Sequence, residues 1–179
     1  MQHLDTNEVL KTVRLGIECG RLPEDTGTDV PAILGKFGLL KDGVLNNAAA
    51  VLFGKHEDME YPQCLLRLAR FKGTDKTVFM DSQRIQGNFF QLLNAAMAFI
   101  FKHLSLSGTT DTLEREEHLT IPYKAIREGV LNSLTHRSYK EAGGSVGIAI
   151  YDDRVEIENP GTFPPDWDAE KMRSEHESK

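Results

Sequence analysis

The chain has 179 residues, of which 40% are hydrophobic and 27% charged, a composition typical of one medium globular domain or two small ones. Its formal net charge of −6 argues against a surface dedicated to nonspecific nucleic-acid binding, because such surfaces need clustered Lys and Arg. The apolar window 89–104 is too short and too polar to cross a membrane, and no signal peptide is recognisable at the amino terminus. We therefore expect a soluble cytoplasmic protein without a membrane partner. Its two distant cysteines, Cys19 and Cys64, are expected to be reduced, mostly buried thiols rather than zinc ligands.

The first part of the chain reads mainly as short helices. Apolar residues recur at helical spacing in residues 7–17 and predict a helix there. A stretch rich in Pro, Gly and acidic residues, 21–29, ends this pattern, and a second helix is expected over 30–37. Residues 48–53 are small and apolar, and they fit either a helix or a strand.

The middle of the chain combines strands with one buried helix. Residues 64–71 and 78–85 alternate in polarity and predict two strands. Residues 91–104 are apolar nearly all round and predict a buried helix. The Ser, Gly and Thr of residues 105–111 indicate a linker, and a strand at a sheet edge is expected over 112–121.

The last part of the chain predicts one long helix followed by a hairpin. Pro122 is placed to open a helix over 123–139, and a loop is expected over 140–144. Two runs of period two flank the turn at 152–153 and indicate antiparallel strands. From Asp168 onward the chain is polar and has no apolar period. The fold class is therefore α+β, with one part over residues 1–111 and another over 112–179.

The helix predicted over 123–139 has one apolar face. This face is formed by Ile126, Val130 and Leu134, which recur at helical spacing. We expect it to pack against the hairpin, either on Val146, Ile148 and Ile150 of the first strand or on the alternate face.

The opposite face of this helix carries the candidate chemistry. Glu128 and Asn132 are one turn apart and therefore neighbour each other. An Asn oxygen can ligate Mg²⁺, and a carboxylate one turn earlier can orient or deprotonate a water molecule. Gly129 beside them would let a ligand approach the backbone closely. The same pair also occurs on solvated helix faces that have no function.

Several strings of the sequence resemble a bacterial and archaeal family of RecG-related proteins and transcriptional regulators with a Schlafen-type AlbA domain. The specific strings are 125–139 (AIREGVLNSLTHRSY), 143–146 (GGSV) and 148–161 (IAIYDDRVEIENPG). Upstream strings similar to the middle segment of the family are 37–43 (FGLLKDG), 50–54 (AVLFG) and 70–74 (RFKGT). The resemblance covers roughly residues 30–165.

This resemblance implies the first half of a GHKL (Bergerat-type) ATPase fold, a two-layer α/β sandwich, with ATP and Mg²⁺ as cofactors of the intact protein. Glu128 would be the catalytic base and Asn132 the magnesium ligand, and the adjoining His136 and Arg137 would meet phosphates. Asn159 and Gly161 occupy the place of the superfamily's Asp-x-Gly-x-Gly motif, whose Asp binds the adenine amino group. An Asn oxygen can accept the same hydrogen bond but lacks the charge.

Two departures from the superfamily affect the functional interpretation. Its lid and later glycine motif should lie beyond Phe163, where neither occurs, and the amino-terminal AlbA-type domain has no counterpart here. The chain is therefore interpreted as a middle fragment that is inactive on its own. A Gly-rich phosphate loop ending in Gly-Lys-Ser/Thr does not occur either, which excludes a helicase motor.

Three functional hypotheses follow. In the first, the intact protein is a GHKL-like ATPase or an ATP-gated switch. In the second, the fold is kept but the nucleotide pocket is degenerate, and the protein is a non-catalytic, DNA-associated regulatory module. In the third, a basic set on the strands contacts DNA directly; its members are Arg67, Arg70, Lys72 and Lys76. The expected partners are a nucleotide, DNA through further domains, and a second copy of the chain.

Overall fold

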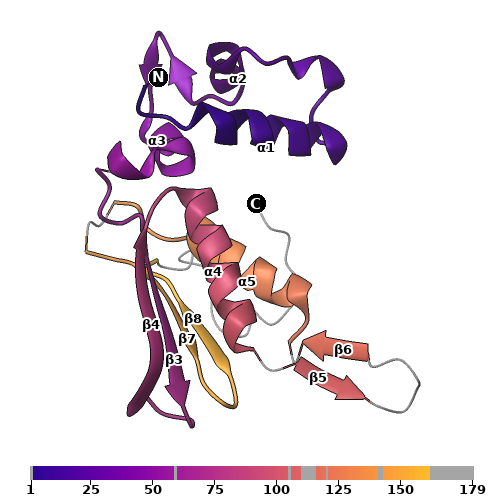
Figure 1. The fold of residues 1–179 in the computed structure, drawn as a ribbon. Coiled ribbons are helices and arrows are strands. Elements are labelled where there is room, and N and C mark those ends of the chain that lie inside the picture. Colours follow the sequence, from indigo (N-terminus) through magenta and orange to yellow (C-terminus); the bar gives the residue numbers. More distant parts are fainter. Residues whose placement is uncertain are drawn as a thin grey trace, which may run out of the picture.

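The computed structural model confirms an α+β fold (Figure 1). It describes residues 2–58, 60–104, 106–109, 116–119, 121–140 and 143–161. The expectation of a polar, aperiodic tail from Asp168 lies outside these residues, as do the positions beyond Phe163 where a lid was sought.

The amino-terminal elements are short and are held by local caps. They are the helices α1 (Thr6–Glu18), α2 (Val30–Lys36) and α3 (Asn47–Phe53), the 3₁₀ turns Glu24–Thr26 and His56–Asp58, and the small hairpin of β1 (Leu40–Lys41) and β2 (Val44–Leu45). Asp5, Asp29 and Asn46 each accept a hydrogen bond from a backbone N–H of the first turn, which starts the three α-helices. The helix predictions over 7–17 and 30–37 are thus confirmed, and the ambiguous segment 48–53 is helical.

A four-stranded sheet forms the centre of the rest of the protein. Its strands are β3 (Leu65–Lys72), β4 (Val78–Gln86), β7 (Val146–Ile150) and β8 (Val155–Glu158), in the order β4-β3-β7-β8. The pairs β3–β4 and β7–β8 are antiparallel hairpins, of which the hairpin of β7 and β8 was predicted, whereas β3 and β7 run parallel with Leu68 opposite Ile148. The parallel pair requires a crossover, and the intervening helices supply it.

Two helices, α4 (Phe89–His103) and α5 (Tyr123–Thr135), pack against one face of this sheet (Figure 1). The predicted contact is confirmed, because the apolar faces of α5 and β7 belong to one hydrophobic cluster. Its members from these two elements are Ile126, Val130, Leu134, Val146, Ile148 and Ile150. Among the helices of the described ranges, none has the length and apolar character needed to cross a bilayer.

The helix α4 is only partly buried, although its composition predicted burial all round. Its inner face is buried, but Phe101 is 38% exposed and stacks on Tyr123 with ring centroids 5.5 Å apart. Aromatic stacking between neighbouring helices thus covers part of the apolar surface that the sheet does not reach. At its start, the Asn88 side chain caps the helix and also donates to the Gly54 carbonyl at 2.9 Å.

The predicted linker 105–111 contains a strand, β5 (Leu106–Thr109), so this prediction was wrong over those residues. β5 pairs antiparallel with β6 (Glu116–Leu119), which lies within the strand expected over 112–121. A run of Ser, Gly and Thr gives too weak a local signal to predict a strand. The hydrogen bonds between β5 and β6 stabilise the strand instead. Residues 105, 110–115 and 120 of the predicted linker and the predicted strand lie outside the described part of the chain.

The hydrophobic residues form two clusters. One extends from Leu4 to Phe53, and the other from Leu66 to Ile150. The rings of Phe53 and Phe90 stack at 5.7 Å within the first cluster, and Phe90 lies on α4, whose buried residues belong to the second. The four-stranded sheet contains two strands from residues 1–111, β3 and β4, and two from residues 112–179, β7 and β8. The two predicted parts of the chain therefore share one sheet.

Candidate functional site

The helix α5 places Glu128 and Asn132 together on its outer face. Both residues are exposed, whereas Ile126 and Val130 of the same helix are buried against the sheet. The Asn132 amide nitrogen donates to the Glu128 carboxylate at 3.2 Å. This bond aligns the two groups, and the oxygen of the exposed Asn132 has no hydrogen-bond partner among the described residues. The pair thus offers hard oxygen atoms of the kind that Mg²⁺ prefers.

Gly129 serves a different purpose from the one expected. A methyl group placed on it would lie 3.2 Å from the Ile157 side chain of β8. What approaches the helix backbone at this point is therefore the sheet and not a ligand. The glycine allows α5 to pack closely on β8, and the expectation that it lets a ligand approach the helix backbone is corrected.

The helix ends at Thr135, four residues before its predicted end at Tyr139. His136 forms the cap, with its backbone N–H bonded to the Asn132 carbonyl at 2.9 Å. The backbone N–H of Ser138 then bonds to the Pro160 carbonyl at 2.5 Å instead of continuing the helical ladder. A tertiary hydrogen bond thus replaces the last helical turn.

Arg137, expected at the phosphates, is buried, with an exposed fraction of 4%. Its Nη2 atom donates to the Gly144 carbonyl at 2.9 Å, and its guanidinium lies 5.0 Å from the centroid of the Tyr139 ring. Its Nε and Nη1 atoms have no hydrogen-bond partner in the part of the chain described. Burial lowers the pKa of this guanidinium, since desolvation disfavours its charged form.

Two neutral groups with raised pKa values surround Arg137. Burial raises the pKa of the Cys64 thiol to about 11 and that of the Tyr139 hydroxyl to about 12. Both side chains are therefore protonated at neutral pH, so Cys64 is an unreactive thiol. Both cysteines are free, as expected, but Cys19 is exposed.

The turn after β8 packs on the end of α5. A methyl group on Gly161 would lie 2.9 Å from the His136 carbonyl and 3.2 Å from the Asn159 amide nitrogen. The structure therefore brings Asn159 and Gly161 beside His136 and Arg137. Asn132 lies one helical turn, about 6 Å, before His136 along α5. The predicted site residues thus follow one helix and one turn, although Arg137 points inward and Glu128 and Asn132 point outward.

The chemistry of this donor set fits a hydrated Mg²⁺ ion that is held largely by other groups. Within the described ranges, no cluster of three or more His, Cys, Asp and Glu side chains could hold a metal alone. Magnesium does not require one, because it commonly takes one or two protein oxygens and completes its octahedron with water and phosphate oxygens. A single amide oxygen from Asn132, with Glu128 beside it, is compatible with that mode.

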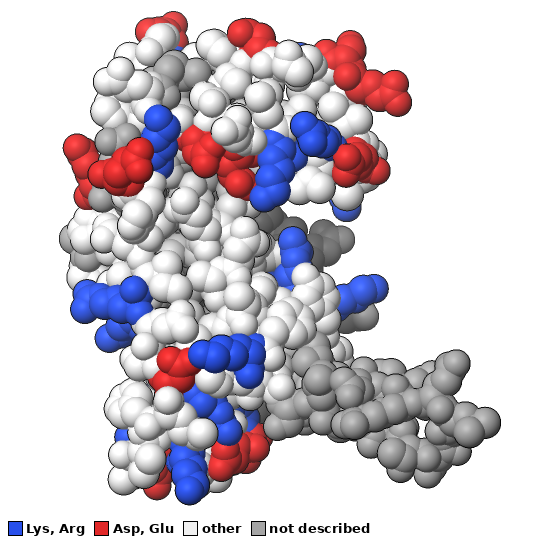
Figure 2. All heavy atoms as spheres, in the orientation of Figure 1, with Lys and Arg blue, Asp and Glu red and all other residues white. Residues whose placement is uncertain are grey.

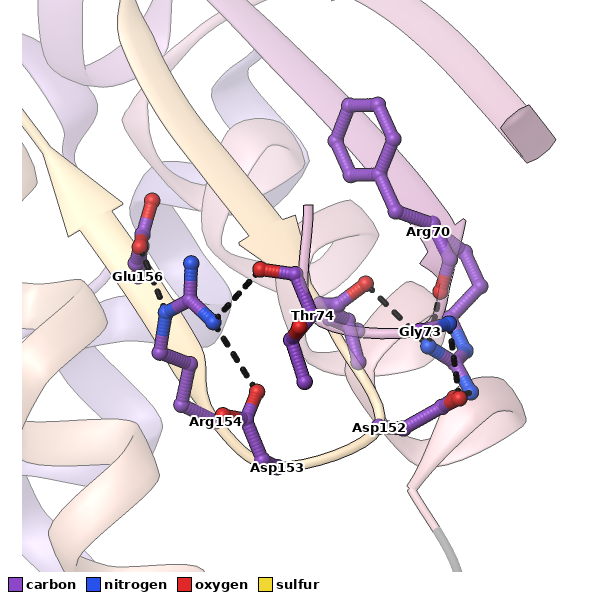
Figure 3. Close-up of polar contacts among 9 residues, drawn as sticks. Arg70, Gly73, Thr74, Asp152, Asp153, Arg154 and Glu156 are labelled. Carbon is purple, nitrogen blue, oxygen red and sulfur yellow. Dashed lines mark hydrogen bonds and ion pairs between the residues drawn. The ribbon is translucent and has the colours of Figure 1, made fainter. Parts of the chain in front are cut away.

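A second polar arrangement, which the sequence did not predict, joins the tips of the two hairpins (Figure 3). The Asp152 carboxylate accepts from the Gly73 backbone N–H at 2.7 Å and from Arg70 at 2.5 Å. Arg154 donates to the Thr74 carbonyl at 3.0 Å and to Glu156 at 2.7 Å. Asp152 was recognised only as a turn residue, because its partners lie about eighty positions away and no local pattern encodes them.

Two cavities occur near these elements. One of about 290 Å³ lies beside the hairpin tips and is lined by Arg70, His103 and Arg154 among others. The other, of about 510 Å³, lies between α3 and the end of α5. Neither is lined by any of the six predicted site residues. On the face drawn in Figure 2, basic and acidic side chains are interspersed, and no continuous basic patch is visible.

The fold and the site describe an α+β protein with a helix-covered mixed sheet and a polar Glu–Asn pair on one helix. Residues 143–179 match the sequence family described as "Putative ATP-dependent DNA helicase recG C-terminal". This match supports a relation of the carboxyl-terminal part to a RecG-related, ATPase-like family. No curated protein matches the chain.

One solved structure has a similar fold. The DIP2311 protein from Corynebacterium diphtheriae superposes with a TM-score of 0.70 and is 15% identical in sequence. The superposition covers 92% of this chain and 32% of that protein, so this chain spans about a third of its length. At such low identity, the likeness concerns the fold alone.

Proposed function

We propose that α5 and the turn after β8 form one side of an ATP–Mg²⁺ site in a RecG-related protein of the GHKL ATPase type. The observation that carries this proposal is the exposed Glu128–Asn132 pair, placed on the helix that leads into the segment with the ATPase-like match. The resemblance of residues 125–161 to the N-box region of that class supports the same interpretation. A helicase motor is not part of the proposal, since the sequence lacks a phosphate-binding Gly-Lys-Ser/Thr loop.

Each residue has a defined role in this proposal. Magnesium, when bound, would neutralise charge on the phosphate oxygens. Asn132 would hold the hydrated ion through its amide oxygen, and Glu128 would accept a proton from, or orient, a water molecule beside it. His136, exposed at the end of α5, would face the phosphates, and the Asn159 oxygen would accept a hydrogen bond from the adenine amino group.

The buried Arg137 is proposed as a positioning residue. It would act through the Gly144 carbonyl, to which it is bonded, and through the neighbouring turn at 159–161. Gly161 leaves the space that this turn needs against the His136 carbonyl, because a methyl group would come within 2.9 Å of that oxygen.

The proposal is tested by titrating the full-length protein with fluorescently labelled ATP in the presence of Mg²⁺, because this chain on its own is expected to be inactive. Asn132→Ala should weaken binding about tenfold or more, because the amide oxygen and its bond to Glu128 are lost. Asn94→Ala is the matched control, since Asn94 is also an exposed asparagine on a helix that packs on the sheet, and it should bind like the wild type. Equal affinity of the two variants, with unchanged melting temperatures, would overturn the proposal.

A second candidate is a non-catalytic, DNA-associated regulatory module in which the fold is kept and the pocket is degenerate. Two observations favour it: Asn159 stands where the superfamily has an Asp, and the Arg137 guanidinium is buried. Under this hypothesis, no ATP binding is seen in the same titration. Arg70, expected among DNA-contacting residues, pairs with Asp152. A salt-dependent gel shift weakened by Arg67→Ala would support direct DNA contact.

A further inference from the structure

The helices α4 and α5 cover one face of the four-stranded sheet and leave the opposite face, here called the outer sheet face, open. Side chains alternate between the two faces along a strand. On β3, Leu66 and Leu68 are buried beneath the helices, whereas Arg67 between them is exposed and therefore lies on the outer sheet face. Arg84 of β4 is directly opposite Arg67 and lies on the same face. The outer sheet face thus carries two arginines side by side.

These two arginines face each other without a counterion. Arg67 and Arg84 are both exposed, and neither guanidinium has an ion-pair or hydrogen-bond partner in the part of the chain that the structure describes. On the other side of Arg67, β7 contributes Gly147, which has no side chain to offer. Like charges directly opposite each other on neighbouring strands destabilise a sheet. An anion that binds both guanidinium groups would remove this repulsion.

An exposed phenyl ring lies on the same face, nearer the hairpin tips. Phe71 follows Arg67 and Ala69 at the strand period of two, and Phe79 of β4 is its partner in the register. The ring centroids of Phe71 and Phe79 are 4.4 Å apart, and Phe71 also stacks on Tyr151 at 5.2 Å. Phe79 is nevertheless 62% exposed. It is therefore held in place by other rings and still presents aromatic surface to a ligand.

Small side chains separate the arginines from this ring. Ala69, Ser82 and Ala149 lie next to one another on β3, β4 and β7, and each is exposed or half-buried. Along β3, the four-residue step from Arg67 to Phe71 spans about 13 Å. A linear ligand can consequently lie flat on the outer sheet face, with its anionic groups at the arginines and a planar ring at Phe79.

We infer that the outer sheet face binds a single strand of nucleic acid. Phosphate groups would pair with Arg67 and Arg84, and an unpaired base would stack on Phe79. A single strand offers anions and accessible ring faces along one flexible chain, whereas the bases of a duplex are already stacked on each other.

This inference rests on the hypothesis of direct DNA contact given above and names its place and its ligand class. It does not depend on the ATP–Mg²⁺ site of α5. Arg70 is not part of the contact, because its guanidinium is paired with Asp152.

The inference is tested by fluorescence anisotropy of a labelled oligothymidylate, titrated with the chain of 179 residues in the absence of ATP. We expect saturable binding whose affinity falls as salt is added, because phosphates that bind arginine release counterions. A duplex and an abasic strand of the same length should each bind about tenfold more weakly, since neither offers a base to Phe79.

Three results would overturn the inference. They are no saturable binding at low salt, equal affinity for the abasic strand, and equal or tighter binding of the duplex. The last of these would still support a DNA contact, so it separates a failure of this inference from a failure of the broader hypothesis. Polyglutamate represents an acidic protein partner, and binding of it as tight as that of oligothymidylate would also overturn the inference.

Variants separate the charge contacts from the stacking contact. Arg67→Ala and Arg84→Ala should each lower the slope of log affinity against log salt by about 0.7, the value for one phosphate on a single strand. Arg14→Ala, at an exposed position of α1, is the matched control and should leave the slope unchanged. Phe79→Ala should weaken binding about tenfold at an unchanged slope, whereas Phe79→Trp should retain it. Tyr123→Ala removes an aromatic ring that is 47% exposed on α5, and it should bind like the wild type.

The substituted side chains on the sheet are exposed, so these variants should keep the melting temperature of the wild type. An unchanged slope in both Arg67→Ala and Arg84→Ala, or an equal change in Arg14→Ala, would contradict the assignment of the outer sheet face. Asn132→Ala should bind oligothymidylate like the wild type, because that residue belongs to the separate site on α5.

Discussion

Glycines in the carboxyl-terminal part act through the space that they leave free. A methyl group would lie 3.2 Å from Ile157 at Gly129, 2.6 Å from the Pro160 ring at Gly144, and 2.9 Å from the His136 carbonyl at Gly161. These contacts hold α5, the loop before β7 and the turn after β8 against one another. The close packing around the candidate site therefore requires glycine at these three positions, because a larger residue would collide with its neighbours.

Gly161→Ala should destabilise the protein, because its methyl group would meet a backbone oxygen that cannot rotate away. Overpacking of this kind typically costs about 1–3 kcal/mol in the free energy of unfolding, measured by urea denaturation. Gly143→Ala is the control, since no atom lies within 4 Å of the methyl position there, and its effect should stay within about 0.5 kcal/mol. Equal stability of the two variants would refute the packing account.

At the scale of elements, the two hairpins are joined at their tips. Asp152 N donates to the Gly73 carbonyl at 3.0 Å, and the Asp152 carboxylate accepts from the Gly73 N–H in return. The Arg154 guanidinium carbon lies 3.9 Å from the centroid of the Tyr151 ring, which in turn stacks on Phe71 at 5.2 Å. These contacts fix β3–β4 to β7–β8 at the end of the sheet farthest from α3 (Figures 1 and 3).

This junction predicts a pH dependence. The hydrogen bonds from Arg70 and from the Gly73 backbone N–H lower the pKa of Asp152 in the folded state. A carboxylate with a lowered folded-state pKa contributes stability above its unfolded pKa of about 3.9, and that contribution is lost as the pH falls through the folded value. Asp152→Asn should therefore lose stability at pH 7 but show a shallower decline below about pH 4, measured by denaturation across pH. Parallel curves for variant and wild type would contradict this.

At the scale of the whole molecule, the second hydrophobic cluster depends on contacts between distant segments. Leu134 is fully buried in it, beside side chains of α4 and β7. Leu134→Ala should cost about 2–5 kcal/mol in the free energy of unfolding, measured by denaturant titration, because a cavity remains in the core. Leu15→Ala, at a residue 50% exposed on α1, should cost less than about 1 kcal/mol. Similar losses for both would mean that the second cluster is not a packed core.

Local periodicity predicted most of the elements, because helices and hairpins encode their side-chain period within a few residues. It located α1, α2, α4, the start of α5, the strands β3 and β4, and the hairpin of β7 and β8. It also placed Glu128 and Asn132 on one face of a helix, which requires only the helical repeat. It missed β5, whose strand character comes from its pairing with β6 and not from its Ser, Gly and Thr residues.

The sequence by itself thus determined the class of fold and the pairing of an acidic and an amide side chain one turn apart. The tertiary structure alone decided where α5 ends, that Arg137 turns inward, and that β3 pairs in parallel with β7. It also decided that Arg84 lies directly opposite Arg67 on the outer sheet face. The physical reason is that hydrogen bonds such as Ser138 to Pro160, and burial between distant segments, outweigh local propensity without leaving a pattern in neighbouring residues.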